Sequence, residues 1–289
     1  MPDFKNPFAD PNLTYKGKTV RQRAEEIEAE ERRQDLEARL AAKGKKKPAK
    51  QPIPPAPTHQ PPPPVGSGFS IESWADTYRI SGVVIDGNEH VVDLDKNLLD
   101  GGKSHTQDEW VVLTKKLPSA KQYNAIILSL YANKDHVNSQ QRALIEEAKE
   151  MLKQDFVKHY MMTSTRVAYQ PTGKDKITHD FGYASMQVIN DDIVGPHAWI
   201  NPASGLEKPI SAILGTDNLA EVEQAYEWLS GKKPYLWRVN EKPTEEVLRA
   251  VVLGLGGSRF GIGAYDDIIN GDRPARGCDL VGQKISGRP

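Results

Sequence analysis

Apolar residues recur at the three- and four-residue spacing of one helix face in two neighbouring segments, residues 118–134 and 138–160. Pro118 is suited to the start of the first helix, and Asn138 is a typical N-cap for the second. A third helix is predicted over residues 217–231, from an Asp-Asn cap to a glycine that would end it. The pattern therefore predicts three amphipathic helices.

Runs rich in β-branched and aromatic residues predict strands between and after these helices. Residues 78–87 alternate in polarity and end in an Asp-Gly pair, which is typical of a hairpin turn. Further strands are expected at residues 110–113, 163–170, 176–189, 235–240, 247–255 and 275–282. Helices come first and an antiparallel set of strands comes last, so the pattern favours an α+β fold over alternating βαβ units.

Composition divides the chain into three parts. Residues 1–47 include a segment rich in Ala, Glu, Arg and Leu, residues 19–43, which predicts a charged helix. Its apolar stripe is thin, so this helix is either a solvated tether or a surface for a partner. Residues 48–68 are rich in proline and predict a disordered, extended linker of about 3 Å per residue. Residues 69–289 have the composition of a globular domain.

The charge balance argues against nucleic acid as a partner. Residues 1–68 hold 13 Lys and Arg against 9 Asp and Glu, whereas the rest of the chain holds 25 against 30. The larger part is mildly acidic and would repel a phosphate backbone. No apolar run has the length of a signal peptide or of a membrane span, so we expect a cytoplasmic protein or a component of a viral particle.

The glycine-rich segment VVLGLGGSRFGIGAYDDIINGDRPARGC, residues 251–278, could hold phosphate or present side chains to a partner. The dinucleotide fingerprint would need a glycine where Arg259 stands, and the phosphate-loop pattern would need a lysine after Gly261. No nucleotide cofactor is therefore expected. The single cysteine, Cys278, excludes an internal disulfide and a thiolate cluster, and the histidines lack metal-ligand spacing, so no metal is expected.

The same segment is better explained as a binding loop. Residues 249–255 predict a buried strand that runs out into a long surface loop, and residues 276–281 are expected to return beside it. The loop mixes aromatic rings with adaptable hydrogen-bonding groups, as antibody paratopes do. The candidate ligand-binding residues are Ser258, Arg259, Phe260, Tyr265, Asp266, Asp267, Ile268, Asn270 and Asp272. The alternative is an ordinary solvated loop.

Three segments near the end of the chain, YLWRVN, VLRAVVLGLGG and RPARGCDLV, resemble the close of C-type-lectin-fold domains. The two helices predicted over residues 118–160 precede them in the matching order. More narrowly, the arrangement resembles the variable proteins of diversity-generating retroelements. The resemblance implies a C-type-lectin-like fold with two helices and a small antiparallel sheet. It also implies that residues 253–273 are rewritten at adenine-containing codons to present a diversifiable surface to a protein ligand.

The resemblance also implies structural roles. Trp237 and Arg238 would lie in a structural strand, and Arg276 with Gly277 would close the terminal strand. The calcium-binding motifs of lectins are replaced, for instance by Gln-Pro-Thr at residues 170–172, so calcium-mediated sugar binding is not expected. The paired cysteines of formylglycine-generating members are missing as well.

An enzyme of unknown type is the alternative function. It would use His179 with Asp180 and Arg166. Adjacent residues on a strand point to opposite faces, so a proton relay between His179 and Asp180 is not expected. The chain also lacks the Gly-x-Ser-x-Gly and Ser-x-x-Lys nucleophile motifs. We therefore expect a binding protein that is not an enzyme.

Overall fold

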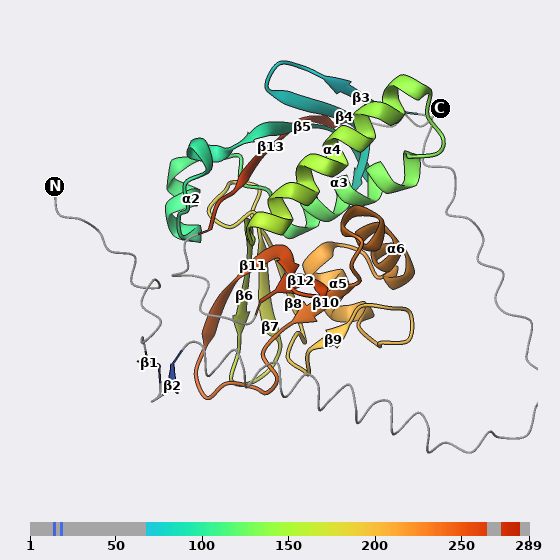
Figure 1. Ribbon diagram of the computed structural model, residues 1–289. Coiled ribbons are helices and arrows are strands. Elements are labelled where there is room, and N and C mark those ends of the chain that lie inside the picture. The colour runs from blue at the N-terminus through green and yellow to red at the C-terminus, as the bar shows by residue number, and fades with distance from the viewer. Residues whose placement is uncertain (1–13, 16–17, 20–67, 265–272, 284–289) are drawn as a thin grey trace, which may run out of the picture. The chain divides into compact units, whose positions relative to one another are not determined.

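The computed structural model describes residues 14–15, 18–19, 68–264 and 273–283 (Figure 1). The chain divides into two compact units, residues 1–59 and residues 60–289. The described residues of the second unit combine helices with two sheets, which confirms the predicted α+β class.

In the first unit, β1 (Thr14–Tyr15) and β2 (Lys18–Thr19) form an antiparallel pair. Of the predicted charged helix, only its first residue is described, and Thr19 lies in β2. The remainder of that helix and the proline-rich linker up to residue 67 lie outside the described residues.

The second unit begins with a four-stranded antiparallel sheet of order β13-β5-β4-β3. Its strands are β3 (Ser70–Ser73), β4 (Thr77–Ile85), β5 (Asn88–Leu98) and β13 (Arg276–Gln283). A two-residue turn joins β4 to β5, and Asp86 and Gly87 have φ angles of 51° and 76°. Two successive residues with positive φ are typical of a type I′ hairpin, so the predicted Asp-Gly turn is confirmed.

A larger sheet of seven strands has the order β8-β7-β6-β11-β12-β10-β9. All neighbouring strands are antiparallel except β10 and β12, which run parallel. The strands are β6 (Met161–Tyr169), β7 (Asp175–His179), β8 (Gln187–Asp191), β9 (Ala198–Trp199), β10 (Pro234–Trp237), β11 (Val247–Gly256) and β12 (Arg259–Gly263). The resemblance implied a small antiparallel sheet, whereas the described residues form the four-stranded antiparallel sheet and, in addition, this larger sheet with its parallel pair.

Three helices confirm the predictions from periodicity. They are α3 (Ala120–Asn133), α4 (Ser139–Lys158) and α6 (Leu219–Ser230). Each begins at a capping side chain, contributed by Ser119, Asn138 and Asn218 in turn. Helix α6 ends at Gly231, whose φ of 72° is the left-handed conformation favoured at this position.

Two further helices were not predicted. Residues 110–113, expected as a strand, belong to α2 (Gln107–Leu113). Thr106 and Glu109 form a reciprocal capping box at its start: the Thr106 hydroxyl accepts from Glu109 N at 3.2 Å, and Thr106 N donates to the Glu109 carboxylate at 2.8 Å. Helix α5 (Glu207–Leu214) has no side-chain N-cap and contains a proline in its first turn. A 3₁₀ turn, η2 (Leu99–Gly102), links β5 to α2.

Helices α3 and α4 contact both sheets. Helix α3 packs on β4 and β6, and α4 packs on β3 and β11. Figure 1 shows both helices lying between the two sheets. Their apolar faces meet one face of the larger sheet, where Leu236, Leu253, Phe260 and Ile262 are fully buried. The other face of that sheet carries a smaller apolar cluster around Trp110.

The segment RPARG, residues 273–277, has a structural role. The carbonyls of residues 273–275 accept hydrogen bonds from Trp110 Nε1 at 2.7 Å, Met162 N at 3.0 Å and Leu99 N at 2.9 Å. The segment therefore fastens α2 and β6 to the strand that follows, β13.

Arg276 adds hydrogen bonds from this segment to buried groups of the core. Its guanidinium is 3% exposed and donates to the Asp155 carboxylate at 2.6 Å and to the Asp95 carbonyl at 2.5 Å. A side chain on the adjacent Gly277 would place its Cβ 2.0 Å from an Asp95 carboxylate oxygen. A larger residue at 277 would therefore have to displace the Asp95 carboxylate. Arg276 and Gly277 are the first two residues of β13.

Candidate functional site

The described part of the glycine-rich segment up to Ala264 forms a hairpin. β11 ends at Gly256, and β12 begins at Arg259 after a turn in which Gly257 has a φ of 57°. β12 returns antiparallel along β11, whereas β13 pairs with β5. The expectation that β11 runs directly into a long loop, with residues 276–281 returning beside it, is therefore wrong.

Three of the nine predicted ligand-binding residues are described. Ser258 is exposed in the hairpin turn, and Arg259 is half-buried at the start of β12. Phe260 is fully buried, and its ring packs edge-on against Phe156 and Tyr226, with centroids 5.1 Å and 4.7 Å away. Phe260 is therefore a core residue and not a ligand contact, because alternation along β12 turns it towards the helices.

The other six predicted residues lie outside the described residues: Tyr265, Asp266, Asp267, Ile268, Asn270 and Asp272. The two ends of their loop are described. At one end, Ala264 N donates to the Trp237 carbonyl at 2.9 Å. At the other, Arg273 exchanges two backbone hydrogen bonds with His105, of 3.0 and 3.1 Å. The two residues that flank the predicted loop are thus bonded to β10 and to the segment before α2.

Three aromatic rings and one guanidinium gather beside the start of this loop. The Tyr235 ring lies 5.1 Å from the Trp199 ring and 4.9 Å from the Trp237 ring, both edge-on. The Arg259 guanidinium lies over all three rings, 4.3 Å from the centroid of Tyr235, 5.2 Å from Trp199 and 5.6 Å from Trp237. Distances below about 6 Å are those of cation–π attraction. We call these four residues the aromatic face.

Strand register explains why these side chains share one surface. Tyr235 pairs with Trp199 on β9 and with Gly261 on β12. Arg259 is two residues before Gly261, so its side chain points to the same side of the sheet as those of Tyr235 and Trp199. Leu236, between Tyr235 and Trp237, points to the opposite side and is buried in the core. Trp199 is 39% exposed and forms the solvent-facing edge of the aromatic face.

The glycines make room for a ring on the same side of the sheet. A Cβ on Gly254 would lie 2.9 Å from both Cα and Cδ1 of Tyr160, and a Cβ on Gly256 would lie 2.2 Å from the Tyr160 hydroxyl. A Cβ on Gly261 would be 3.4 Å from the same ring. The Tyr160 side chain therefore lies directly on a strip of backbone that only glycine leaves open. Close packing, and not phosphate binding, accounts for these glycines.

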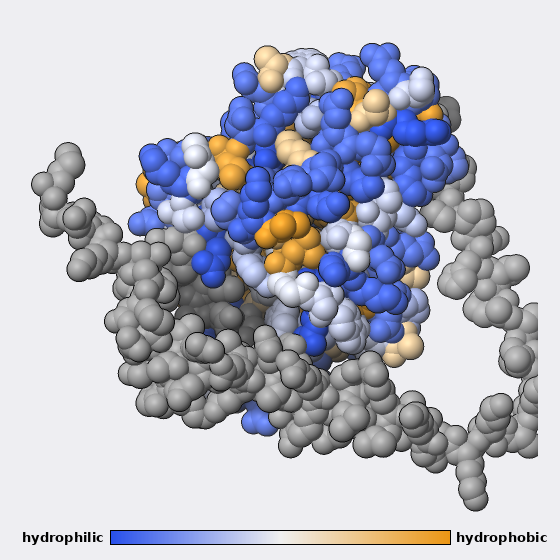
Figure 2. Space-filling model, in the orientation of Figure 1, coloured by the Kyte–Doolittle hydropathy of each residue, from blue (hydrophilic) through white to orange (hydrophobic). Residues whose placement is uncertain are grey.

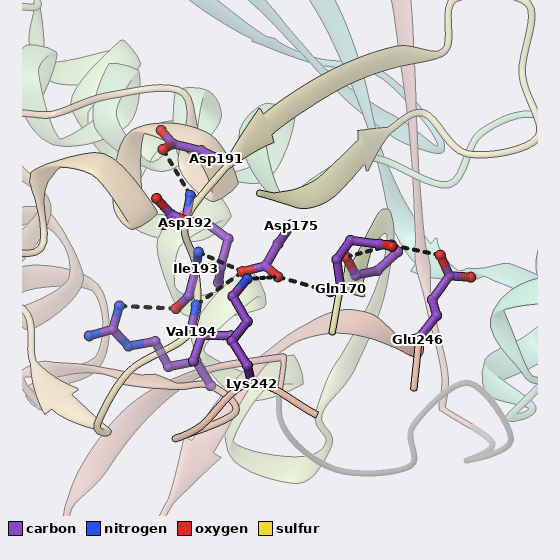
Figure 3. Close-up of polar contacts among 10 residues, drawn as sticks. Gln170, Asp175, Asp191, Asp192, Ile193, Val194, Lys242 and Glu246 are labelled. Atoms are coloured by element: carbon purple, nitrogen blue, oxygen red, sulfur yellow. Dashed lines mark hydrogen bonds and ion pairs between the residues drawn. The ribbon is translucent and has the colours of Figure 1, made fainter. Parts of the chain in front are cut away.

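A buried carboxylate fixes the segment that leads into β9 (Figure 3). Asp175 is fully buried and accepts hydrogen bonds from the backbone N–H groups of Gln170 (3.0 Å), Ile193 (2.9 Å) and Val194 (3.2 Å). The Lys242 ammonium lies 2.6 Å from the same carboxylate. A buried charge is tolerated when it is paired and hydrogen-bonded in this way, so Asp175 has a structural role.

Arg238 continues this support up to the aromatic face. Its guanidinium donates to the carbonyls of Ile193 and Pro196, each at 3.0 Å. Its backbone N–H donates to His197 Nδ1 at 3.2 Å, and the His197 ring lies 4.8 Å from the Trp237 ring. The segment before Trp199 is therefore held on both sides, which makes the aromatic face a fixed surface.

The residues proposed for the enzyme alternative are not brought together. His179 is fully buried: its Nδ1 lies 3.0 Å from the Thr165 hydroxyl, and its Nε2 lies 2.9 Å from the Ala212 carbonyl. Since a carbonyl can only accept, Nε2 carries the proton and Nδ1 accepts from Thr165. Burial lowers the pKa of His179 to about 4, with Lys121 adding to the effect.

Arg166 follows Thr165 on β6 and points to the opposite face of the sheet. There it donates to Gln107 at 2.8 Å and to Asp108 at 2.5 Å, both in α2, and stacks 3.6 Å from the centroid of the Phe181 ring. Asp180 has a φ of 51°, and burial raises its pKa. The imidazole and the guanidinium therefore lie on different sides of the sheet, and no shared site results.

Among the described residues, no group of three or more His, Cys, Asp and Glu side chains is placed to hold a metal ion. None of the described helices has the length and apolar character to cross a membrane. Figure 2 shows a mainly hydrophilic surface with a small hydrophobic patch near the C-terminal end of α4, a size that is ordinary for a protein surface.

No protein-family model, curated protein or solved structure matches this chain. The residues of a functional site are therefore identified from their side-chain geometry. Of the aromatic face, Tyr235 and Trp237 could have been placed on one surface from strand alternation. Trp199 gave no such signal, because it lies in a segment, residues 194–205, that the sequence indicates only as loop.

Proposed function

We propose that this protein is a non-enzymatic ligand-binding protein, and that the aromatic face and the adjoining loop of residues 265–272 form its binding surface for a protein ligand. The observation that carries the proposal is the position of the Arg259 guanidinium over three aromatic rings, of which Tyr235 is buried and Trp199 is exposed at the edge of the sheet. Tryptophan, tyrosine and arginine are the residues that dominate binding energy at protein interfaces.

The rigidity of the surroundings supports this proposal. Binding surfaces gain affinity when their anchors are already held in the bound arrangement. The hydrogen bonds from Arg238 hold the segment before Trp199, and the Tyr160 ring packs on the glycine strip beside the aromatic face. The loop is anchored at both ends by backbone hydrogen bonds. A fixed platform beside an anchored loop allows the loop to change its side chains without disturbing the fold.

We further propose that the second unit is a C-type-lectin-like domain and that its loop is diversified, as in the variable proteins of retroelements. Two features support this proposal. The last described strand, β13, pairs with β5 near the start of the unit, and α3 and α4 follow β5 after the short elements η2 and α2. In addition, the exposed turn residue Ser258 and the half-buried Arg259, which lies on the aromatic face, are separable from the core position Phe260, because Phe260 points to the opposite side of β12 from Arg259.

The test is a selection of peptides against the full-length protein from a random phage-displayed library. Trp199→Ala and Arg259→Ala should each weaken the selected peptides by roughly 30-fold, the loss typical of an interface hot spot. The matched control is Val188→Ala, which removes a side chain that is 44% exposed on β8, at the other edge of the same sheet. Circular dichroism would check that each variant is folded.

Peptides that bind the Trp199→Ala protein as tightly as the native protein would contradict the proposed surface. A glycan array, probed in parallel, separates a protein ligand from a sugar. A glycan that requires Trp199 would retain the site but overturn the assignment of a protein ligand.

A further inference from the structure

The segments that build the aromatic face carry charge of one sign. They are residues 194–206 around β9, residues 231–239 around β10 and residues 254–264 in the hairpin of β11 and β12. These segments contain no aspartate or glutamate, and their cationic residues are Lys232, Lys233, Arg238 and Arg259. A surface of this composition attracts groups of negative charge.

One of these cations is buried beneath the face without a carboxylate among its described partners. Arg238 is 8% exposed, and its guanidinium donates to the carbonyls of Ile193 and Pro196. A Cβ on Gly195 would lie 2.7 Å from a guanidinium nitrogen, so the backbone closes directly over the charge. Burial lowers the pKa of Arg238, because it removes water from the cation, but arginine keeps its proton in proteins. Salt screens a buried charge of this kind less than an exposed one.

The two lysines lie in the turn that leads into β10. The Lys233 ammonium is 2.8 Å from the Glu223 carboxylate of α6, so its charge is balanced. Lys232 is exposed. The Lys233 carbonyl accepts from Phe260 N at 3.0 Å, which fixes this turn beside the start of β12, where Arg259 lies. The described part of the face is therefore positively charged.

Arg259 determines which anionic group fits best. A guanidinium has five N–H donors in a planar fork that matches a carboxylate. Arg259 is half-buried over three aromatic rings, and a charge-assisted hydrogen bond is stronger in such surroundings than in water. The Trp199 ring beside it is 39% exposed and offers contact area to an apolar neighbour of that carboxylate.

We propose that the protein ligand presents an acidic segment to the aromatic face: an aspartate or glutamate side chain faces Arg259, and an apolar side chain next to it lies on Trp199. This inference rests on the proposed function and names the chemistry of its partner. Residues 265–272 contain three aspartates, which belong to the part of the surface proposed to be diversified. Lys232 and Arg238, in contrast, belong to the segments that hold the face in place.

The experiment selects binders of the full-length protein from two phage-displayed peptide libraries. Alternate positions encode Asp or Glu in the first library and Lys or Arg in the second, and the remaining positions are random in both. We expect clones that require Trp199 for binding to come from the acidic library. In a synthetic peptide from such a clone, replacing the acidic residue by its amide should weaken binding at least about tenfold.

A double-mutant cycle then tests the contact with Arg259. Arg259→Gln should weaken the acidic peptide by a similar factor, and it should weaken the amide peptide little, because both changes remove the same contact. Added salt should weaken the native complex more than the Arg259→Gln complex. The matched control, Arg142→Gln, removes an exposed arginine of α4 and should leave binding unchanged.

Three results would overturn this inference and leave the proposed function standing. They are Trp199-dependent clones that come equally or mainly from the basic library, losses from the amide peptide and Arg259→Gln that add in full, and an equal loss with Arg142→Gln. Clones that bind Trp199→Ala as tightly as the native protein, or the recovery of no clone from either library, would contradict the proposed function and this inference together.

Discussion

The buried histidine of β7 predicts a loss of stability in mild acid. His179 is neutral in the folded protein, with its two ring nitrogens bound to Thr165 and Ala212. Burial lowers its pKa from 6.5 to about 4. In the unfolded chain the imidazole regains its ordinary pKa and takes up a proton as the pH falls below 6.5, while the folded protein does not do so until about pH 4.

The direction and size of the pH effect on the free energy of unfolding follow from this difference in pKa between the folded and unfolded states. Between pH 6.5 and pH 4 the unfolded state binds more protons than the folded state, so the free energy of unfolding falls as the pH falls. At about 1.4 kcal/mol per pH unit, the full effect is about 3 kcal/mol. The folded protein has this full contribution to its stability above pH 6.5 and has lost most of it by pH 4.5.

The assay is urea unfolding followed by tryptophan fluorescence from pH 7.5 to pH 4.5. Native protein is compared with His179→Gln, which cannot titrate, and with His136→Gln, which changes an exposed histidine. The advantage of the native protein over His179→Gln should shrink by roughly 3 kcal/mol across this range. Parallel profiles for the native protein and His179→Gln would refute the buried neutral imidazole. They would also reopen a proton-transfer role for His179 near neutral pH.

Two other predictions concern the packing that holds the candidate site. Arg276→Met leaves the Asp155 carboxylate buried without its partner and should lower the free energy of unfolding by about 3–5 kcal/mol. In urea unfolding, the double variant with Asp155→Leu should recover much of that loss, and failure to recover any would argue against the ion pair as the cause. Gly254→Ala should destabilise by roughly 2 kcal/mol or more, because its Cβ meets backbone atoms at 2.9 Å, whereas Gly282→Ala on β13 meets nothing within 4 Å. Equal melting temperatures for these two variants would show that the glycine strip is not closely packed.

The long helices were predictable because their signals are local. α3, α4 and α6 each have a polar N-cap followed by apolar residues at helical spacing, and both features can be read within some fifteen residues. The Asp-Gly turn between β4 and β5 is equally local. In α2 two local signals conflict. Thr106 and Glu109 form a capping box, which indicates a helix, but the short apolar run that follows is typical of a strand and led to the wrong prediction.

The candidate site was predicted only in part, because it depends on distant pairings. Five residues with two glycines, RFGIG, gave little reason to expect the strand β12, and without β12 the burial of Phe260 cannot be inferred. The aromatic face needs β9, β10 and β12 side by side, a contact among segments separated by tens of residues. Trp199 enters the site only through that pairing.

The most direct test of the proposed binding surface is to sequence this gene across many closely related cells or viruses and to score substitutions codon by codon. We expect changes at adenine-containing codons to concentrate at Ser258, at Arg259 and within residues 265–272. Phe260 and Gly254, which are buried in the fold, should stay constant. Substitutions spread evenly over the second unit, or a loop as constant as the core, would contradict a diversified binding surface.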